Sequence, residues 1–303
     1  MSPKLKPFLS FLFVGLVLYF ITKFILTNFS ELKAHPLKFN FSSLILSFLF
    51  SCIGFFNYAL IWQFITLKNK CALSLEKGVM AWFYSELGKY IPGKIFLATA
   101  KVYFYNLDGK SQRKVLFCFY LETICTFLAA GFVFLISLLF FQTKVLLDFQ
   151  YYVYVLIGIF FLILHPKVIE QTINLVLVRL KKEPVHISLS YADVLMIIGF
   201  YILNFLIIGI AFFWLVHSLY PVSRENVFFL IGAFALASLM GMLGVFAPAG
   251  LGVREGILLL TLKNILPNSI SGIVAILSRV WTVLVEVFLV GLIFMYSKIR
   301  KIC

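Results

Sequence analysis

The sequence predicts an all-α polytopic membrane protein, a bundle of about eight transmembrane helices with two broken or re-entrant segments around Pro92 and Pro248. Hydrophobic residues make up 62% of the chain and charged residues 13%, which is far from the composition of a soluble domain. A helix that crosses the hydrocarbon core, about 30 Å thick, needs about 20 largely apolar residues. Runs of this kind recur along the chain, so we expect one integral membrane domain, 1–303.

Seven apolar runs are clear candidates for membrane spans. The first, about 8–26, follows Lys4 and Lys6 and is too long for the hydrophobic part of a signal peptide, so we expect it to be retained. The other six follow in order at about 41–67, 115–141, 151–165, 191–217, 227–247 and 270–296.

The basic residues set the expected orientation. The stretch from Lys68 to Lys114 is the richest in lysine and arginine, and the positive-inside rule places such a stretch in the cytoplasm. Two spans precede it, so the N-terminus is expected there as well. Seven crossings would leave the basic tail 298–301 outside, and an eighth at about 251–266 returns it to the cytoplasm. We therefore predict a multi-pass protein of the inner (plasma) membrane with both termini cytoplasmic.

Composition and motifs also limit the chemistry. In so apolar a chain, the net charge of +14 is better explained by lipid headgroups than by nucleic acid. The five cysteines are scattered without a CxxC pair, and no histidine stands at zinc-ligand spacing, so we expect no disulfide, metal site or cofactor. No HExxH, GxSxG or DxD motif occurs, so we propose no catalytic residue.

Two segments fit neither a span nor a simple loop. At about 168–180, apolar residues recur near helical spacing, which is typical of a helix lying at the membrane interface. At about 73–103, apolar and charged residues are mixed. Pro92 lacks an amide donor and Gly93 tolerates positive φ, so the helix is expected to break there. At membrane depth, such a break is tolerated only where it is buried in protein or lines a watery cavity.

A similar break recurs late in the chain, in GVFAPAGLGVREG at 244–256. In both breaks a basic residue follows the proline and glycine: Lys94 in the first and Arg254 in the second. Interrupted segments at corresponding places in two halves of a chain point to the binding site of a transporter. A helix that begins after such a break has free amides, so with the basic residue it is suited to hold a lipid phosphate. The alternative is a pair of interfacial turns whose basic side chains extend to headgroups.

The two motifs resemble the paired signatures of the lysylphosphatidylglycerol synthase transmembrane family. The matching residues are YIPGK at 90–94 with Lys101, and the more specific APAGLGVREG at 247–256. The resemblance extends over nearly the whole chain in its order of spans, and Glu122 and Arg279 also resemble family positions. It implies a flippase-like fold that binds or moves lipids between leaflets. The acyltransferase domain of the two-domain members is not present, so the resemblance implies a stand-alone form that does not itself transfer lysine.

The candidate site combines the two motifs with their charged neighbours. Glu86 and Glu255 are expected to balance the basic residues or to contact an amine. The predicted lipid-binding residues are Glu86, Lys89, Pro92, Gly93, Lys94, Lys101, Pro248, Gly250, Gly252, Arg254 and Glu255.

Charged residues also stand inside two apolar spans. Glu122 and Glu286 each interrupt an apolar run, and a charge at membrane depth costs at least about 2.5 kcal/mol, so each is expected to face the bundle interior. Arg279 precedes Glu286 by two helical turns on nearly the same face. One interpretation is a structural ion pair, for example Glu122 with Arg279. The other is that these groups line a polar path or that one glutamate titrates.

The function we expect is that of a flippase-like protein that binds or translocates anionic or polar lipids. A phospholipid, an aminoacyl-lipid and an isoprenoid-linked glycolipid all remain candidate substrates. One alternative is a non-transporting membrane partner of a separate lipid-modifying enzyme. The other is a lipid-modifying transferase, which would need a nucleophile, base or metal constellation.

Overall fold

The computed structural model describes residues 39–90, 95–140, 155, 166–179, 189–244 and 250–300. Within these ranges the chain is helical and has no strand. Five of the described helical segments are long and apolar enough to cross a membrane, as a multi-pass membrane protein requires. The predicted span at 8–26 and nearly all of the one at 151–165 lie outside the described residues.

The five candidate spans follow predicted apolar runs. Four are single long helices, and the fifth, Arg224–Leu243, joins the 3-10 helix η2 (Arg224–Asn226) to α10. The helices are α3 (Phe41–Lys68), α6 (Gln112–Leu138), α9 (Tyr191–Leu219), α10 (Val227–Leu243) and α12 (Asn268–Arg300).

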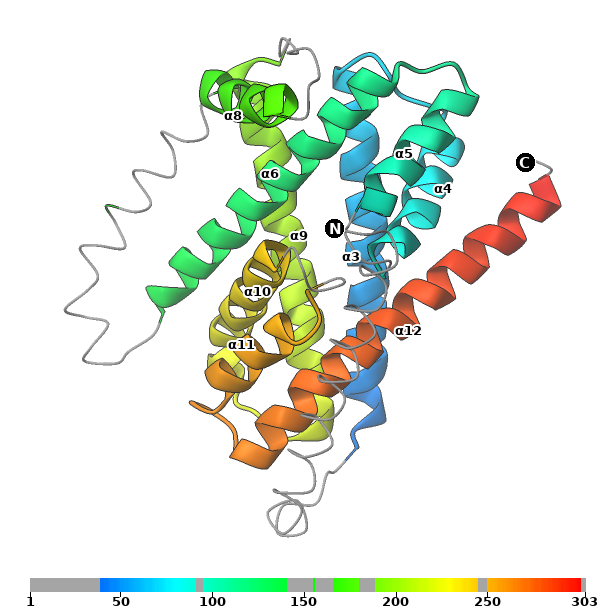
Figure 1. Cartoon of the computed structure of the whole chain (residues 1–303). Helices are drawn as coiled ribbons and strands as arrows, with labels where there is room; N and C mark the ends of the chain where they lie inside the picture. The colour runs from blue at the N-terminus through cyan, green and yellow to red at the C-terminus, as the bar shows by residue number, and fades with distance from the viewer. Residues whose placement is uncertain are drawn as a thin grey trace, which may run out of the picture.

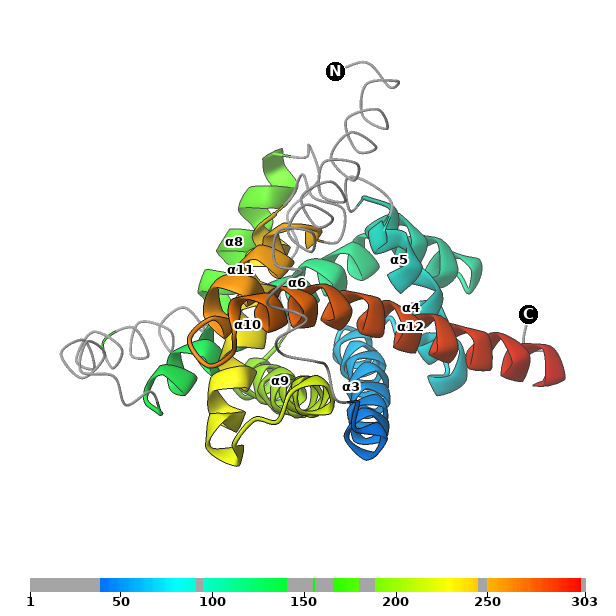
Figure 2. The ribbon, with the colours of Figure 1, turned by 90° about the horizontal axis from the view of Figure 1, so that it is seen from below.

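Helices α3 and α9 run antiparallel and side by side (Figures 1 and 2), at one side of the bundle in the view of Figure 2. At one end the Asn40 amide donates to the Ser218 carbonyl at 2.9 Å, and at the other the Lys68 ammonium lies 2.7 Å from the Asp193 carboxylate. Between these ends, a Cβ atom on Gly54 would lie 2.4 Å from Ile208. The glycine therefore allows the close approach of two helices that is common in membrane proteins.

Two helical hairpins occupy opposite halves of the bundle (Figure 1). The first consists of α4 (Leu75–Glu86), the 3-10 helix η1 (Leu87–Tyr90) and α5 (Ile95–Leu107), and the second consists of α10 and α11 (Val253–Leu262). The helix ends that lead into the two turns lie near the middle of the bundle. We call these units the first and second hairpins.

The order of long helix, hairpin and long helix therefore occurs twice along the chain. The first set is α3, the first hairpin and α6; the second is α9, the second hairpin and α12. In Figure 1 the corresponding helices of the two sets run in opposite directions through the bundle. This arrangement is an inverted repeat of elements, a plan found in many transporters.

Both predicted breaks fall where described helices end and begin. Helix α11 follows the second break and has 10 residues, so it is about 15 Å long, roughly half the thickness of a hydrocarbon core. It packs back against α10 instead of standing alone. The structure therefore does not confirm the separate crossing predicted at 251–266, nor the count of eight.

Most of the described basic residues outside the bundle interior gather at one end of the bundle, which we call the basic end. The Tyr296 hydroxyl donates to Glu76 at 2.9 Å, so the last turns of α12 lie beside the start of α4. Helix α8 (Pro166–Arg179), where an interfacial helix was predicted, lies at this end too (Figure 1). Among the described residues only Arg224 and Lys263 stand at the opposite end. The basic end holds Lys68, Lys70, Lys77, Lys110, Arg113, Lys114, Lys167, Arg179, Lys298 and Arg300.

Candidate functional site

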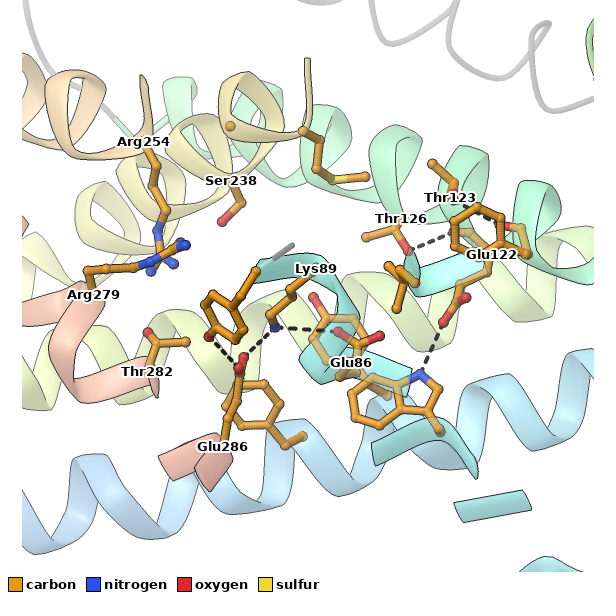
Figure 3. A pocket seen from close by; sticks show the side chains of 18 residues that line it. Glu86, Lys89, Glu122, Thr123, Thr126, Ser238, Arg254, Arg279, Thr282 and Glu286 are labelled. Atoms are coloured by element: carbon orange, nitrogen blue, oxygen red, sulfur yellow. Dashed lines mark hydrogen bonds and ion pairs between the residues drawn. The ribbon is translucent and has the colours of Figure 1, made fainter. Parts of the chain in front are cut away.

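A cavity of about 340 Å³ lies where the two hairpins meet (Figure 3). Its walls come from both hairpins and from the three long helices α3, α6 and α12. Residues beside both predicted breaks line it: Lys89 and Tyr90 from the first hairpin, and Gly241, Met242 and Arg254 from the second. The structure thus brings the neighbourhoods of the two sequence motifs together around one space.

A glycine in each hairpin lets its two arms touch through their backbones. A Cβ atom on Gly88 would lie 2.9 Å from backbone atoms of Phe96 and Leu97. In the second hairpin a Cβ atom on Gly250 would lie 2.6 Å from the Gly241 carbonyl oxygen, and the φ of Gly250 is +72°. Residues with an L side chain rarely adopt that φ, and at both glycines the backbone contact leaves no room for a Cβ atom. The two glycines therefore hold the hairpins closed beside the cavity.

The start of α11 differs from the open helix terminus that the motif suggests. The Glu255 carboxylate accepts a hydrogen bond from the Gly252 amide at 2.6 Å, and Gly252 has a φ of +85°. An acidic side chain that caps its own helix satisfies one of the amides left free at the N-terminus. Glu255 is therefore a helix cap in the structure. It is not among the residues that line the cavity, and neither are Gly250 and Gly252.

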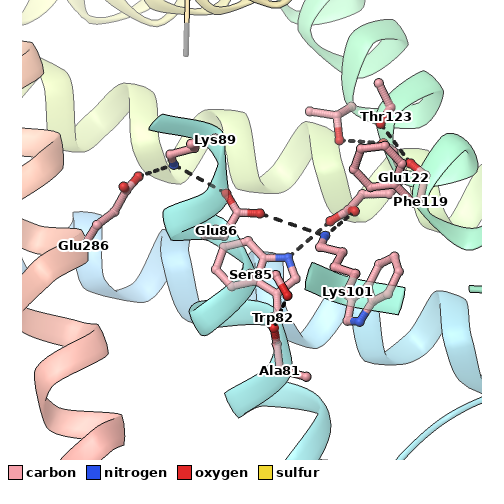
Figure 4. Close-up of polar contacts among 12 residues, drawn as sticks. Ala81, Trp82, Ser85, Glu86, Lys89, Lys101, Phe119, Glu122, Thr123 and Glu286 are labelled. Atoms are coloured by element: carbon pink, nitrogen blue, oxygen red, sulfur yellow. Dashed lines mark hydrogen bonds and ion pairs between the residues drawn. The ribbon is translucent and has the colours of Figure 1, made fainter. Parts of the chain in front are cut away.

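Alternating charges run along one side of the cavity, from α12 through the first hairpin to α6 (Figure 4). The Glu286 carboxylate accepts from the Lys89 ammonium and from the Tyr90 hydroxyl, each at 2.5 Å. Lys89 also lies 3.4 Å from Glu86. Because Glu286 is only 3% exposed, these two donors replace the water that its charge requires.

The same row of charges continues into the first hairpin and α6. Lys101 lies 2.5 Å from Glu122 and 3.9 Å from Glu86, and the indole of Trp82 donates to Glu122 at 3.2 Å. Lys101 is 1% exposed and stacks over the ring of Trp62 at 4.1 Å. Lys101 was predicted to bind lipid, but it lies behind the cavity wall and neutralises Glu122. Lys101 is therefore the ion-pair partner of Glu122, a role that one interpretation of the sequence gave to Arg279.

Two arginines stand at the other end of the cavity. Arg254 from α11 and Arg279 from α12 extend toward each other, and they lie close enough to interact electrostatically (Figure 3). Arg254 is 8% exposed, with its guanidinium 4.7 Å above the Phe234 ring. Its Nε and Nη2 atoms are buried and have no hydrogen-bond partner among the described residues. No described carboxylate lies within ion-pair distance of it, so Glu255, which was expected to balance a basic residue or to contact an amine, forms no ion pair with Arg254.

Several cavity residues were not predicted from the sequence. Tyr90 was noticed only as part of the motif, and Trp82 not at all. A helical spacing would have pointed to others, because Thr126 follows Glu122 by four residues and Thr282 precedes Glu286 by four, so each pair shares a helix face. Four predicted site residues lie outside the described part of the chain: Pro92, Gly93, Lys94 and Pro248.

Comparison with known protein families and curated proteins found no match. The site is therefore interpreted from its own chemistry.

Proposed function

We propose that this protein binds the phosphate-bearing headgroup of a membrane lipid in the cavity between its hairpins and carries that headgroup between the leaflets. The headgroup phosphate lies between Arg254 and Arg279, and the acyl chains stay in the surrounding lipid. Such an activity is that of a flippase. It also agrees with the resemblance of the two motifs to the lysylphosphatidylglycerol synthase transmembrane family, which remains part of this proposal.

The buried guanidinium of Arg254 is the observation that supports this function most directly. Burying a charge without a partner costs several kcal/mol, so buried charges are normally paired. Arg254 has two unpartnered donors among the described residues and faces a cavity that a second arginine also lines. A guanidinium matches the oxygens of a phosphate with two parallel hydrogen bonds, and Arg279 adds a second positive charge beside the same cavity. We infer that the ligand of this cavity is an anion.

The setting of the cavity favours a lipid over a free anion. Four of the five candidate spans carry exposed large apolar side chains, as contact with acyl chains requires. Within that apolar bundle, the cavity combines ionised groups with the rings of Phe55, Tyr58 and Trp82. A headgroup needs the polar part, and the first carbons of its glycerol or sugar contact the rings.

We place the basic end of the bundle in the cytoplasm and the protein in the inner (plasma) membrane. In the described part of the chain, ten basic residues at one end against two at the other follow the positive-inside rule. The predicted spans at 227–247 and 251–266 then correspond to a hairpin that enters and leaves on the same side, and the first hairpin enters from the other. Because a hairpin makes no net crossing, both termini stay cytoplasmic, as predicted with eight crossings.

The test of this function is lipid binding by purified Arg254 variants. The probe is acyl-labelled phosphatidylglycerol, retained by the protein in detergent and competed with inorganic phosphate. We expect Arg254→Ala to weaken binding about tenfold or more, because a charge-assisted hydrogen bond contributes about 1.5 to 3 kcal/mol. Arg254→Lys should recover part of the loss, since it keeps the charge without the fork. The matched control is Arg224→Ala, which removes an exposed arginine at the opposite end.

Three outcomes separate the alternatives. Equal binding by Arg254→Ala and the wild type would contradict the headgroup site. Competition by inorganic phosphate at the same concentration as lipid would show a site for a free anion. Arg254-dependent binding without movement of labelled lipid across reconstituted vesicles would favour the non-transporting partner of a lipid-modifying enzyme.

A further inference from the structure

A second, smaller cavity of about 160 Å³ adjoins the first. Their walls have seven residues in common, which form the partition between them. Its charged members are Lys89, Arg254 and Glu286, and the others are Phe55, Tyr58, Ser238 and Thr282. Beyond the partition, the walls differ. The first cavity continues between the first hairpin and α6. The second continues between α3, α9 and α12, toward the end opposite the basic end, along Ser47, Ser51, Leu215 and Ser278.

One carboxylate, that of Glu286, joins the two sides of the partition. Glu286 on α12 accepts from both Lys89 and Tyr90 of the first hairpin, which joins the long helix to the end of η1. Lys89 has a second carboxylate, Glu86, at 3.4 Å, so it keeps an acidic neighbour if Glu286 releases it. An anion that approaches Lys89 competes with Glu286 for the same ammonium.

Arg254 is the group that serves both cavities. Arg279 lines only the first, whereas Arg254 lines both, and its Nε and Nη2 atoms have no hydrogen-bond partner among the described residues. Four serines also line the second cavity: Ser47, Ser51, Ser238 and Ser278. The Ser47 hydroxyl accepts from the Trp281 indole at 3.0 Å, so this space contains polar side chains in an otherwise apolar region.

We propose that the smaller cavity is a second station for the phosphate of the same headgroup, entered when Glu286 releases Lys89. The anion moves from the Arg254 and Arg279 pair to a site between Arg254 and Lys89, so it is never without a cationic partner. This inference rests on the proposed function, since it names where the bound headgroup goes next. It assigns to the Lys89–Glu286 ion pair the role of the barrier between the two stations.

The first experiment fills the second cavity and leaves the first unchanged. Ser51→Leu puts an isobutyl group into the smaller cavity, and Ser42→Leu, on the exposed face of the same helix, is the matched control. Detergent-purified protein is tested for retention of acyl-labelled phosphatidylglycerol. Reconstituted phosphatidylcholine vesicles report its movement between leaflets. We expect Ser51→Leu to bind within twofold of the wild type and to move lipid at least tenfold more slowly, with Ser42→Leu unchanged in both.

A second variant decides the question if Ser51→Leu does not fold. Glu286→Gln removes the charge that competes for Lys89, and Glu286→Asp keeps it. We expect Glu286→Gln to bind the labelled lipid about tenfold more tightly than Glu286→Asp.

Three results would overturn the second station. They are unchanged lipid movement in folded Ser51→Leu, an equal loss of binding and movement in that variant, and equal affinities of the two Glu286 variants. Failure of the proposed function itself looks different, because then Arg254→Ala binds as tightly as the wild type before any of these variants is compared.

Discussion

Lys101 illustrates how this protein holds full charges inside an apolar bundle. Its ammonium is buried between the Trp62 ring and the Glu122 carboxylate, which also accepts from Trp82. A buried pair of this kind adds little stability relative to two apolar residues, but removal of one partner leaves the other charge uncompensated. The pair therefore matters for stability chiefly when it is broken.

This gives a prediction for the residue pair. Lys101→Met should lower the free energy of unfolding by about 3 to 5 kcal/mol, because Glu122 keeps a buried charge. The double variant Lys101→Met/Glu122→Leu should recover most of that loss. Thermal unfolding in detergent measures both. Lys77→Met, which breaks the exposed pair with Asp108, is the control and should change stability by less than about 1 kcal/mol. A double variant no more stable than the single one would contradict this account.

At the residue scale the sequence predicts which charges are buried better than it predicts their partners. Glu122 and Glu286 interrupt apolar runs, so their inward orientation follows from the cost of exposing a charge to lipid. Their partners, Lys101 and Lys89, belong to the segment at about 73–103, in which apolar and charged residues are mixed. The way this segment folds decides which of its side chains face α6 and α12. No helical spacing connects two residues on separate elements, and Arg279 was a plausible but incorrect partner for Glu122 for that reason.

At the scale of elements, the hairpins depend on backbone contact at two glycines. Gly88 and Gly250 each occupy a position where a Cβ atom would meet the backbone of the opposite arm. Gly256 lies a few residues beyond Gly250, within α11, and a Cβ atom there would meet nothing within 4 Å. The chain thus offers a constrained and an unconstrained glycine in the same segment.

We expect the two substitutions to act in opposite directions. Gly250→Ala should lower the melting temperature and reduce lipid binding, because it combines a positive φ with a backbone contact at 2.6 Å. Gly256→Ala should leave binding unchanged and raise stability by about 0.5 to 1 kcal/mol, since alanine favours the helix. Thermal unfolding and retention of labelled lipid are measured on both. Equal stabilities would show that the arms of the hairpin are not held by this contact.

Element boundaries were largely predictable, but the packing of α11 back against α10 was not. Helices α3, α6, α9 and α12 coincide with predicted spans to within a few residues, apart from four at the C-terminal end of α12, because apolar length is a direct signal. The run at 227–247 and the short one at 251–266 were taken as two crossings. Apolarity does not distinguish a helix that crosses from one arm of a hairpin, since both are surrounded by apolar groups. Only the packing of α11 against α10 reveals the hairpin.

At the scale of the whole molecule, the inverted repeat and the basic end together predict a topology. Ser111 precedes α6 at the basic end, and Ser223 precedes η2 at the opposite end; both are exposed. In a background with the native cysteines replaced by alanine, Ser223→Cys should react with a membrane-impermeant maleimide added to intact cells. Ser111→Cys should react only after the membrane is permeabilised. Reaction of both from the same side would contradict the orientation and the crossing pattern.

The two halves of the repeat have the same order of helices, but their hairpins differ in charged residues. The first hairpin carries Glu86, Lys89 and Lys101, all held in ion pairs, whereas Arg254 of the second has no such partner among the described residues. If the halves exchange conformations, the backbones of the two resulting states are related by a two-fold rotation, but the states are unequal in energy. The protein then has a preferred resting state even in a symmetric membrane, and this asymmetry sets which leaflet the empty cavity faces.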